Sequence, residues 1–111
     1  MGRWSLVLLI ALPLAAQVNT ADILGTVTDS TGAVLPRVKV TAENLATSIQ
    51  RETISQEDGN YLVTLLPAGR YRVRAEQTGF SAFQVPEVTL AAGDRLRVDI
   101  RLEVGDRKSV V

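Results

Sequence analysis

Hydrophobic and polar residues alternate along most of this 111-residue chain, and short turn-forming segments separate the alternating runs. In the clearest run, residues 70–76, Tyr71, Val73 and Ala75 alternate with arginine and glutamate. Residues 95–103 alternate aliphatic and charged residues in the same way. A period of two residues is that of a strand with one buried and one solvated face. A helical period of 3.6 residues would instead scatter the arginines of both runs through the core.

Five weaker runs of the same kind lie between turn-forming residues. Together with the two clear runs they give seven predicted strands: residues 21–28, 38–43, 49–55, 61–66, 71–76, 88–90 and 95–103. Pro86 is predicted to interrupt the chain before the sixth strand, and residues 49–55 are predicted to form an edge. Short strands joined by turns at roughly ten-residue spacing predict an all-β domain, a seven-stranded antiparallel β-sandwich of the Ig-like type.

Two turn sequences lie near the middle of the chain, and a tyrosine follows each of them. Asp-Gly at residues 58–59 stands between two extended runs and predicts a tight hairpin, because glycine readily adopts positive φ. Pro-Ala-Gly at residues 67–69 predicts a second turn, with proline at its start and glycine at its exit. Tyr61 and Tyr71 each begin an inward-facing row, so we expect both tyrosines to anchor the core.

The composition argues against catalysis. Cysteine and histidine are both absent, which removes the thiolate nucleophile, the usual general base and the commonest ligands of transition metals. Ser55 and Ser81 therefore have no histidine partner, and the acidic residues are scattered over turns and wet faces. Asp58 and its neighbours could bind calcium, but their spacing differs from the Asp-rich calcium loop and a plain turn explains them. We therefore predict no catalytic, cofactor-binding or metal-binding residue.

The overall charge is balanced, since 12 lysines and arginines stand against 12 aspartates and glutamates. Binding to nucleic acid depends on excess positive charge that neutralises phosphates. Nothing in the bulk charge of this chain therefore points to a nucleic acid or to an anionic membrane as partner.

The first 16 residues have the pattern of a signal peptide. Arg3 gives a positive start, residues 6–12 are apolar, and small residues follow. The apolar stretch is shorter than the roughly 20 residues that a membrane-spanning helix needs. We expect cleavage after Ala16, with cleavage after Ala21 as the alternative. The sequence thus predicts an exported chain whose mature part has no transmembrane helix.

The order of the turn and strand motifs resembles the carboxypeptidase regulatory-like family. The motifs are Gly25-x-Val27-x-Asp29-x-x-Gly32-x-x-Leu35-Pro36-x-Val38-x-Val40, then Asp58-Gly59-x-Tyr61, Leu66-Pro67-x-Gly69-x-Tyr71-x-Val73, and Gly79-Phe80. The resemblance covers residues 22–103 and implies a transthyretin-like sandwich, a fold also grouped with carbohydrate-binding-like domains. Residues 104–111 are then a tail or a truncated linker. Arg37 stands where the family often has glycine, and Gln56 where it often has aspartate or asparagine.

Signal peptide, domain and tail in this order resemble the N-terminal part of TonB-dependent outer-membrane receptors. That resemblance implies a non-catalytic accessory or interaction domain in the periplasm or at the outer membrane. Its partner would be a neighbouring receptor domain or another envelope protein. The chain ends at Val111, before any plug or barrel, so it is either a stand-alone relative or part of a longer receptor. The alternative function is that of a carbohydrate-binding module.

Carbohydrate binding would need exposed aromatic rings, and the chain offers few. The only tryptophan, Trp4, lies in the predicted signal peptide. Phe80 and Phe83 follow a glycine in a predicted loop, and these two are the candidates for stacking on a sugar. Packing into the core is the competing interpretation for both rings.

Arginines on the predicted wet faces are the candidates for binding an acidic partner. They form two stripes, Arg70, Arg72 and Arg74 in one and Arg95, Arg97 and Arg101 in the other. Facing strands could merge Arg72, Arg74 and Arg97 into one basic patch. We favour the simpler interpretation, a solvated face on which interleaved acidic residues neutralise the arginines.

Overall fold

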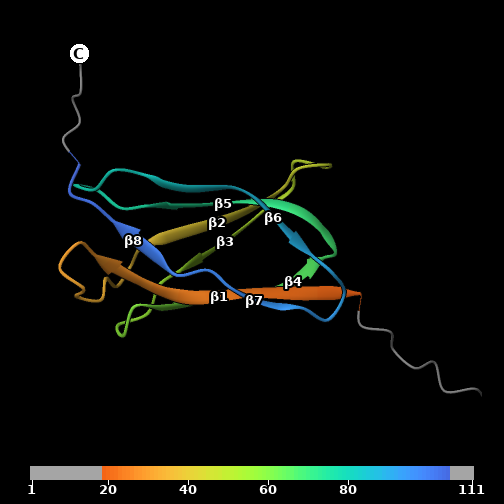
Figure 1. Ribbon diagram of the computed structural model, residues 1–111, viewed down its shortest axis with the longest axis horizontal. Coiled ribbons are helices and arrows are strands. Elements are labelled where there is room, and N and C mark those ends of the chain that lie inside the picture. The colour runs from red at the N-terminus through yellow and green to blue at the C-terminus, as the bar shows by residue number, and fades with distance from the viewer. Residues whose placement is uncertain (1–18, 106–111) are drawn as a thin grey trace, which may run out of the picture.

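The computed structural model describes residues 19–105 and forms a sandwich of two sheets (Figure 1). Its eight strands are β1 (Thr20–Asp29), β2 (Lys39–Asn44), β3 (Gln50–Ile54), β4 (Asn60–Pro67), β5 (Gly69–Glu76), β6 (Phe83–Leu90), β7 (Arg95–Arg97) and β8 (Ile100–Leu102). The all-β prediction is confirmed, with eight strands in place of seven. Across this range, no helix is long and apolar enough to cross a membrane. The predicted signal peptide and residues 106–111 of the predicted tail lie outside it.

One sheet has the strand order β4-β1-β7, with β8 also paired to β1, and the other has the order β3-β2-β5-β6. Pairing is antiparallel except at β7 and β8, which both run parallel to β1. After β6 the chain returns to the first sheet beside the start of β1, where Gly93 N donates to Thr20 O at 2.8 Å. It therefore follows β1 in the same direction. The predicted antiparallel sandwich is thus confirmed, and β7 and β8 are the two strands that pair in parallel.

The predicted strand at residues 95–103 is divided in two between β7 and β8. Val98 N donates to Leu24 O at 2.8 Å, and the Asp99 carboxylate accepts a hydrogen bond of 3.0 Å from Thr26 N. A side chain thus replaces the main-chain partner that a continuous strand would supply. This replacement accounts for the additional strand.

The prediction of a hairpin at residues 58–59 is wrong, although the turn itself is present. Gly59 has φ 82°, and its N–H donates to Gln56 O at 2.8 Å. However, β3 pairs with β2 and β4 pairs with β1, so the turn carries the chain from one sheet to the other. Both strands pair with a central strand of their own sheet. β4 buries Tyr61, Val63 and Leu66 between the sheets, whereas β3 is a polar strand that is exposed except at half-buried Thr53. A turn sequence specifies that the chain reverses its direction, but it does not determine which strand the following strand pairs with.

The core lies between the two sheets and is built from the predicted inward rows. Its buried members are Ala21, Ile23, Val27, Val38, Val40, Ala42, Tyr61, Val63, Leu66, Tyr71, Val73, Ala75, Leu90, Ile100 and Leu102. Tyr61 and Tyr71 are both core anchors, as predicted. Their hydroxyl groups donate to main-chain carbonyls, Tyr61 to Val98 O at 2.5 Å and Tyr71 to Pro67 O at 2.6 Å. Burial, with the nearby Asp99 carboxylate as a smaller cause, raises the pKa of Tyr61 well above its usual range.

Pro86 does not interrupt its strand, contrary to the prediction. β6 runs through it from Phe83 to Leu90 at the edge of the second sheet. The register of β5 and β6 shifts between Tyr71 and Val73, opposite the proline. An edge strand with a bulge tolerates a residue without an N–H. The other edge of this sheet is β3, as expected for residues 49–55.

Candidate functional site

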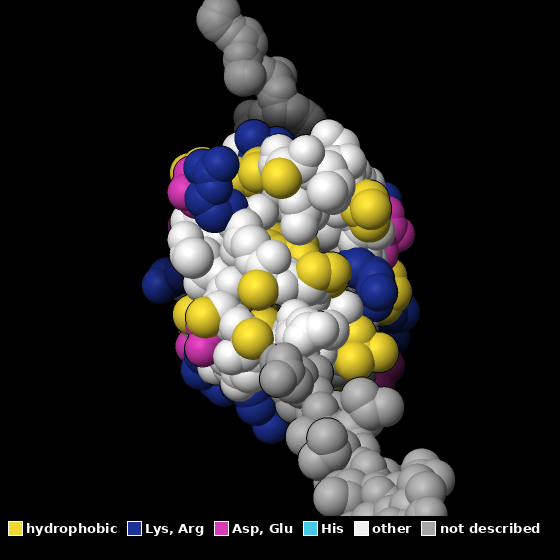
Figure 2. Space-filling model, turned by 90° about the vertical axis from the view of Figure 1, so that its right-hand side faces the viewer, with side chains coloured by type: hydrophobic (Ala, Val, Ile, Leu, Met, Phe, Trp, Pro, Cys, Tyr) yellow, Lys and Arg dark blue, Asp and Glu magenta, His cyan; other side chains and the backbone are white. Residues whose placement is uncertain are grey.

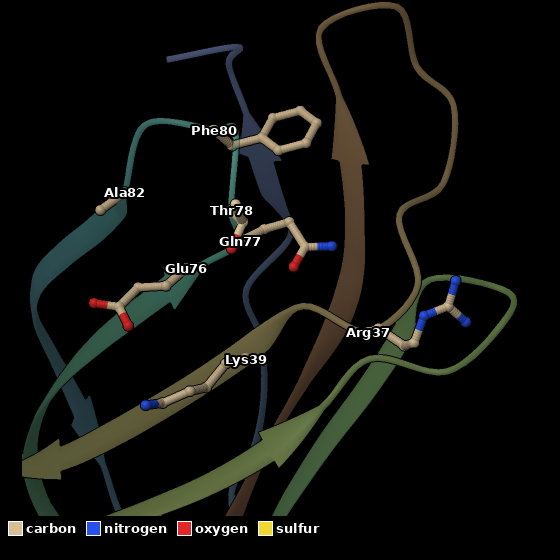
Figure 3. Close-up of a pocket in the computed structure, with 7 residues that line it drawn as sticks. All are labelled: Arg37, Lys39, Glu76, Gln77, Thr78, Phe80 and Ala82. Carbon is tan, nitrogen blue, oxygen red and sulfur yellow. The ribbon is translucent and has the colours of Figure 1, made fainter. Parts of the chain in front are cut away.

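An open hollow of about 380 Å³ lies where β2 and β5 meet the loop between β5 and β6 (Figure 3). Its lining residues are Arg37, Lys39, Glu76, Gln77, Thr78, Phe80 and Ala82. The register of the two strands sets Lys39 opposite Glu76, and Figure 3 shows both side chains directed away from Arg37. An aromatic ring beside polar groups is a combination found in sites for small polar ligands.

The charges around this hollow are already balanced by neighbours. The ion pairs are Arg37–Glu57 at 2.8 Å, Lys39–Glu52 at 3.6 Å and Glu76–Arg74 at 2.5 Å. Gln77 Nε2 donates a long hydrogen bond of 3.4 Å to Pro36 O. A ligand would therefore meet Phe80, Thr78 and neutralised charges, an arrangement that suits a neutral polar molecule better than an ion.

The structure separates the two phenylalanines that the sequence singled out. Phe80 lines the hollow, whereas Phe83 begins β6 and is not among the lining residues. Both rings are half-buried and pack against the core. Lys39, Gln77 and Thr78 are further residues around Phe80 that the sequence pattern does not indicate. The pairing of β2 with β5 brings Lys39 there, and no local pattern predicts that pairing.

The candidate arginines do not form one patch. Arg72 and Arg74 belong to β5, whereas Arg97 belongs to β7 in the other sheet. Arg72 pairs with Glu43 at 3.1 Å, and Arg97 pairs with Asp99 at 3.1 Å. Glu43 lies on the neighbouring strand β2, and Asp99 lies in the break between β7 and β8. The charge on each face is therefore balanced locally. The Arg97–Asp99 pair is exposed and contributes little to stability, whereas the Arg72–Glu43 pair is partly buried.

Ser55 and Asp58, which the sequence analysis set aside as chemical groups, both serve the loops. Ser55 is buried, and its hydroxyl accepts a hydrogen bond of 2.8 Å from Val38 N and donates one of 2.7 Å to Leu35 O. The Asp58 carboxylate accepts from Asn60 N at 2.9 Å. In residues 19–105, no group of three or more His, Cys, Asp and Glu side chains is placed to hold a metal ion.

Asp29 shows the same use of an acidic residue at a turn. Its Oδ1 accepts hydrogen bonds from the Thr31 hydroxyl at 2.6 Å, from Thr31 N at 2.8 Å and from Ala33 N at 3.1 Å. These bonds favour the charged form, so they lower the pKa of the Asp29 carboxyl, with the Thr31 hydroxyl as the largest cause. An ionised carboxylate held by its own loop is a structural element of the turn.

One end of the sandwich carries exposed apolar side chains, and we call it the apolar end (Figure 2). It consists of the turns that follow β2, β4 and β6, and its exposed apolar residues are Ala46, Ile49, Leu65, Pro67, Ala68, Ala91 and Ala92. Ile49 is 64% exposed and Leu65 is 60% exposed. Residues 44–49, 65–69 and 90–93 contain no charged residue, and the turn after β6 then ends with exposed Asp94, whose carboxylate accepts a hydrogen bond of 2.8 Å from Ala91 N. Exposed apolar side chains gathered at one end of a domain are typical of a site that another molecule covers.

Solved structures show the same fold in proteins of varied kinds. The TIE protein of Bacillus anthracis is 15% identical with a TM-score of 0.64, over 78% of this chain and 17% of that one. The catechol 1,2-dioxygenase of Acinetobacter radioresistens is 11% identical with a TM-score of 0.64, over 81% and 53%. A putative carbohydrate binding protein of Bacteroides uniformis is 23% identical with a TM-score of 0.60, over 74% and 40%. These likenesses concern the fold alone.

This chain spans about half or less of the length of these three solved proteins. A search of curated protein sequences finds no significant match. In contrast, the sequence profile of the carboxypeptidase regulatory-like domain matches residues 22–103, which include all eight strands except the first two residues of β1. By this match, the chain belongs to the carboxypeptidase regulatory-like domain family.

Proposed function

We propose that this protein is an exported, non-catalytic interaction domain that serves a TonB-dependent receptor system of the outer membrane. The observation that carries the proposal is the apolar end. Three separate turns there present exposed aliphatic side chains, and Asp94, at the end of the turn after β6, is their one charged residue. The partner would be a neighbouring receptor domain or another envelope protein that covers this surface. The signal-peptide pattern of residues 1–16 supports export.

The energetics of the apolar end favour an interaction role. Ile49 and Leu65 are more than half exposed, and Pro67 and Ala68, which are also exposed, follow Leu65 after the buried Leu66. Burial of apolar surface contributes about 25 cal/mol per Å². An uncharged partner surface that leaves the Asp94 carboxylate in water would gain this contribution without having to desolvate an ion. The apolar end is therefore suited to a stable contact inside a larger protein.

The polar residues support the non-catalytic part of the proposal. Ser55 is held by two hydrogen bonds in the interior, and Asp29 and Asp58 are engaged in their own turns. The chain has no histidine or cysteine that could activate a nucleophile. Each charged residue at the hollow is paired with an opposite charge. Structure and composition together thus favour recognition over chemistry.

Envelope fractionation with crosslinking in the native host tests this proposal. The wild-type protein should appear in the outer-membrane or periplasmic fraction and should crosslink to a receptor of the TonB-dependent class. Ile49→Lys and Leu65→Lys should each abolish the crosslink without lowering the melting temperature. Val34→Lys is the matched control, since Val34 is 45% exposed in the loop before β2, away from the apolar end. A cytoplasmic location, or a crosslink that survives both lysines, would contradict the proposal.

A second candidate function is carbohydrate binding at the hollow beside Phe80. It is favoured by the half-buried aromatic ring, by the neutralised charges around it and by the fold shared with a putative carbohydrate binding protein. The absence of a second aromatic residue from the lining argues against it, because sugar sites gain much of their affinity from stacking.

A glycan array followed by calorimetry tests the carbohydrate hypothesis. Phe80→Leu keeps most of the packing volume but removes the ring face, so it should weaken any saccharide binding at least tenfold. Phe83→Leu is the matched control, since Phe83 also packs on the core but does not line the hollow. Equal loss in both variants, or no saccharide binding by the wild type, would exclude this function.

A further inference from the structure

β3 has an unpaired edge whose main-chain groups can be assigned. Ser55 N, directly after β3, donates to Val38 O at 2.9 Å and so faces β2. Neighbouring residues of a strand turn their main-chain groups to opposite sides, so every second residue back from Ser55 also faces β2. The residues between them turn their N–H and C=O groups to the open edge: Gln50, Glu52 and Ile54. This edge therefore offers a regular row of donors and acceptors.

The other strand edges within residues 19–105 are obstructed. β6 contains Pro86 and a register shift, while β7 and β8 have only three residues each. β4 has a register shift near Leu65, which has φ 59°, and Arg51 Nη1 donates to Thr64 O on that strand at 3.2 Å. Proline, bulges and short strands are the usual means by which a sheet edge is protected from further pairing. Residues 50–54 contain no proline and no register shift, and their charged residues are Arg51, which bonds to β4, and Glu52.

We propose that an extended segment of the partner protein adds to β3 as a fifth strand of the β3-β2-β5-β6 sheet. This inference rests on the proposed function, since it names the surface and the chemistry by which the interaction domain would recognise its partner. Ile49 lies directly before β3 and also belongs to the apolar end. A partner that covers the apolar end is therefore already beside the open edge. Main-chain pairing of this kind is a common way to bind extended segments.

The outward row of β3 specifies side chains on the incoming segment. The Glu52 carboxylate is half-exposed and lies 3.6 Å from Lys39 Nζ, and the Ile54 side chain is 53% exposed. Residues directly opposite each other on paired strands interact most strongly. The segment should therefore carry lysine or arginine opposite Glu52 and an apolar residue opposite Ile54.

A second copy of this chain is a poor occupant of the edge. Antiparallel pairing of two β3 strands has to align their outward-pointing main-chain groups. A register centred on Glu52 sets two carboxylates opposite each other, and a register centred on Arg51 opposes two guanidinium groups. A register centred on Thr53 places Glu52 against Ile54. Like charges directly opposite each other destabilise a strand pair. The same side chains that permit a basic segment thus oppose self-association.

A synthetic peptide titrated into the full chain and followed by NMR tests the inference. The peptide has seven residues, with valine, lysine and glutamine at its second, fourth and sixth positions and threonine at the others. In antiparallel alignment these three face Ile54, Glu52 and Gln50. The amide resonances of Gln50, Glu52 and Ile54 should shift and these amides should become protected from hydrogen exchange. The amides of Phe80 and Arg97 should show neither change. Replacing the lysine of the peptide by glutamate should weaken binding about fivefold.

Variants on each side of the contact separate main-chain pairing from other binding. Glu52→Pro removes an N–H that faces the open edge, so it should weaken binding at least tenfold and leave the thermal unfolding transition cooperative. Glu52→Ala is the matched control, since it removes the charge but keeps the N–H. If Glu52→Pro fails to fold, a peptide with N-methyl groups at the positions facing β3 gives the same test on the wild-type protein. Unchanged affinity for the N-methylated peptide would overturn the inference.

Three results would refute strand addition at β3 and would still be compatible with the proposed function. Peptide shifts could map to the apolar end or to another edge. The chain could form a dimer in light scattering that Glu52→Pro abolishes. Glu52→Pro could keep the full receptor crosslink in the native envelope. Failure of the proposed function is a separate outcome, in which the wild-type protein forms no receptor crosslink at all.

Discussion

The hydroxyl of Tyr61 donates a hydrogen bond of 2.5 Å to the main-chain carbonyl of Val98. This bond joins β4 to the segment between β7 and β8, on the opposite side of β1. It passes over Gly25, where a Cβ would lie 2.1 Å from the same carbonyl. The Val98 carbonyl, in the break between β7 and β8, is thus the acceptor for the Tyr61 hydroxyl. Residue 25 is glycine because a Cβ there would collide with this carbonyl.

Tyr61→Phe should lower the free energy of unfolding by about 1–2 kcal/mol, because it leaves the Val98 carbonyl in a partly buried position without its donor. The ring itself would still fill the core, so the fold should be retained. Urea denaturation followed by circular dichroism measures the effect. A loss near zero would show that water replaces the hydroxyl at this carbonyl.

Alkaline pH should destabilise the wild-type protein through the same residue. The pKa of Tyr61 is raised in the folded state by burial and by Asp99. A raised pKa means that its contribution to stability is complete below the unfolded value of about 10 and is lost as the pH rises towards the folded value. Tyr61→Phe lacks this group, so the difference in stability between wild type and variant should shrink above about pH 10. Denaturation curves at several pH values for both proteins test this prediction, and a constant difference would contradict it.

Gly25→Ala should destabilise the domain by about 3 kcal/mol or more, because the new methyl group would collide with a main-chain oxygen that cannot move alone. Gly32→Ala provides the comparison. Gly32 has φ 91°, and a methyl group there would meet no atom within 4 Å, so only backbone strain of about 1–2 kcal/mol applies. Thermal unfolding of both variants gives the ranking, and equal losses would refute the steric explanation.

Arg37→Gly should be more stable than Arg37→Ala by about 1 kcal/mol. Arg37 has φ 62°, a region that costs a residue with a Cβ about 1–2 kcal/mol and that glycine adopts freely. Both variants lose the ion pair between Arg37 and Glu57, so its contribution cancels in the comparison. The pair is solvated, since the Arg37 side chain is 70% exposed and the Glu57 side chain 83% exposed. The melting temperatures decide the question. An alanine variant as stable as the glycine variant would mean that the loop relaxes around residue 37.

Ser55→Ala should cost about 1–3 kcal/mol, because two main-chain groups at Val38 and Leu35 would lose their buried partner. Ser81 is exposed, so Ser81→Ala should change stability by less than about 0.5 kcal/mol. Chemical denaturation of both variants measures the contrast. The opposite ranking would show that the Ser55 hydroxyl has little structural importance.

The candidate site was only partly predictable from the sequence. Phe80 was identified because an aromatic residue after Gly79 in a loop is a recognisable local signal. Lys39, Gln77 and Thr78 were not, since they meet Phe80 through the pairing of β2 with β5 and the loop that follows. The separation of Arg72 from Arg97 has the same origin. Which sheet each strand joins is a long-range property that no neighbouring residues encode.

Local patterns in the chain were enough to specify most of the strands, their buried faces and the family. Tyr71, Val73 and Ala75 face inward in the structure as their alternation predicted, because a period of two residues is a local property of the chain. Long-range contacts were needed to establish that Asp58-Gly59 links two sheets and that Asp99 divides the last predicted strand. These outcomes depend on which distant main-chain groups find partners when both apolar faces are buried together. The pairing of the strands is therefore determined by tertiary contacts across the whole domain.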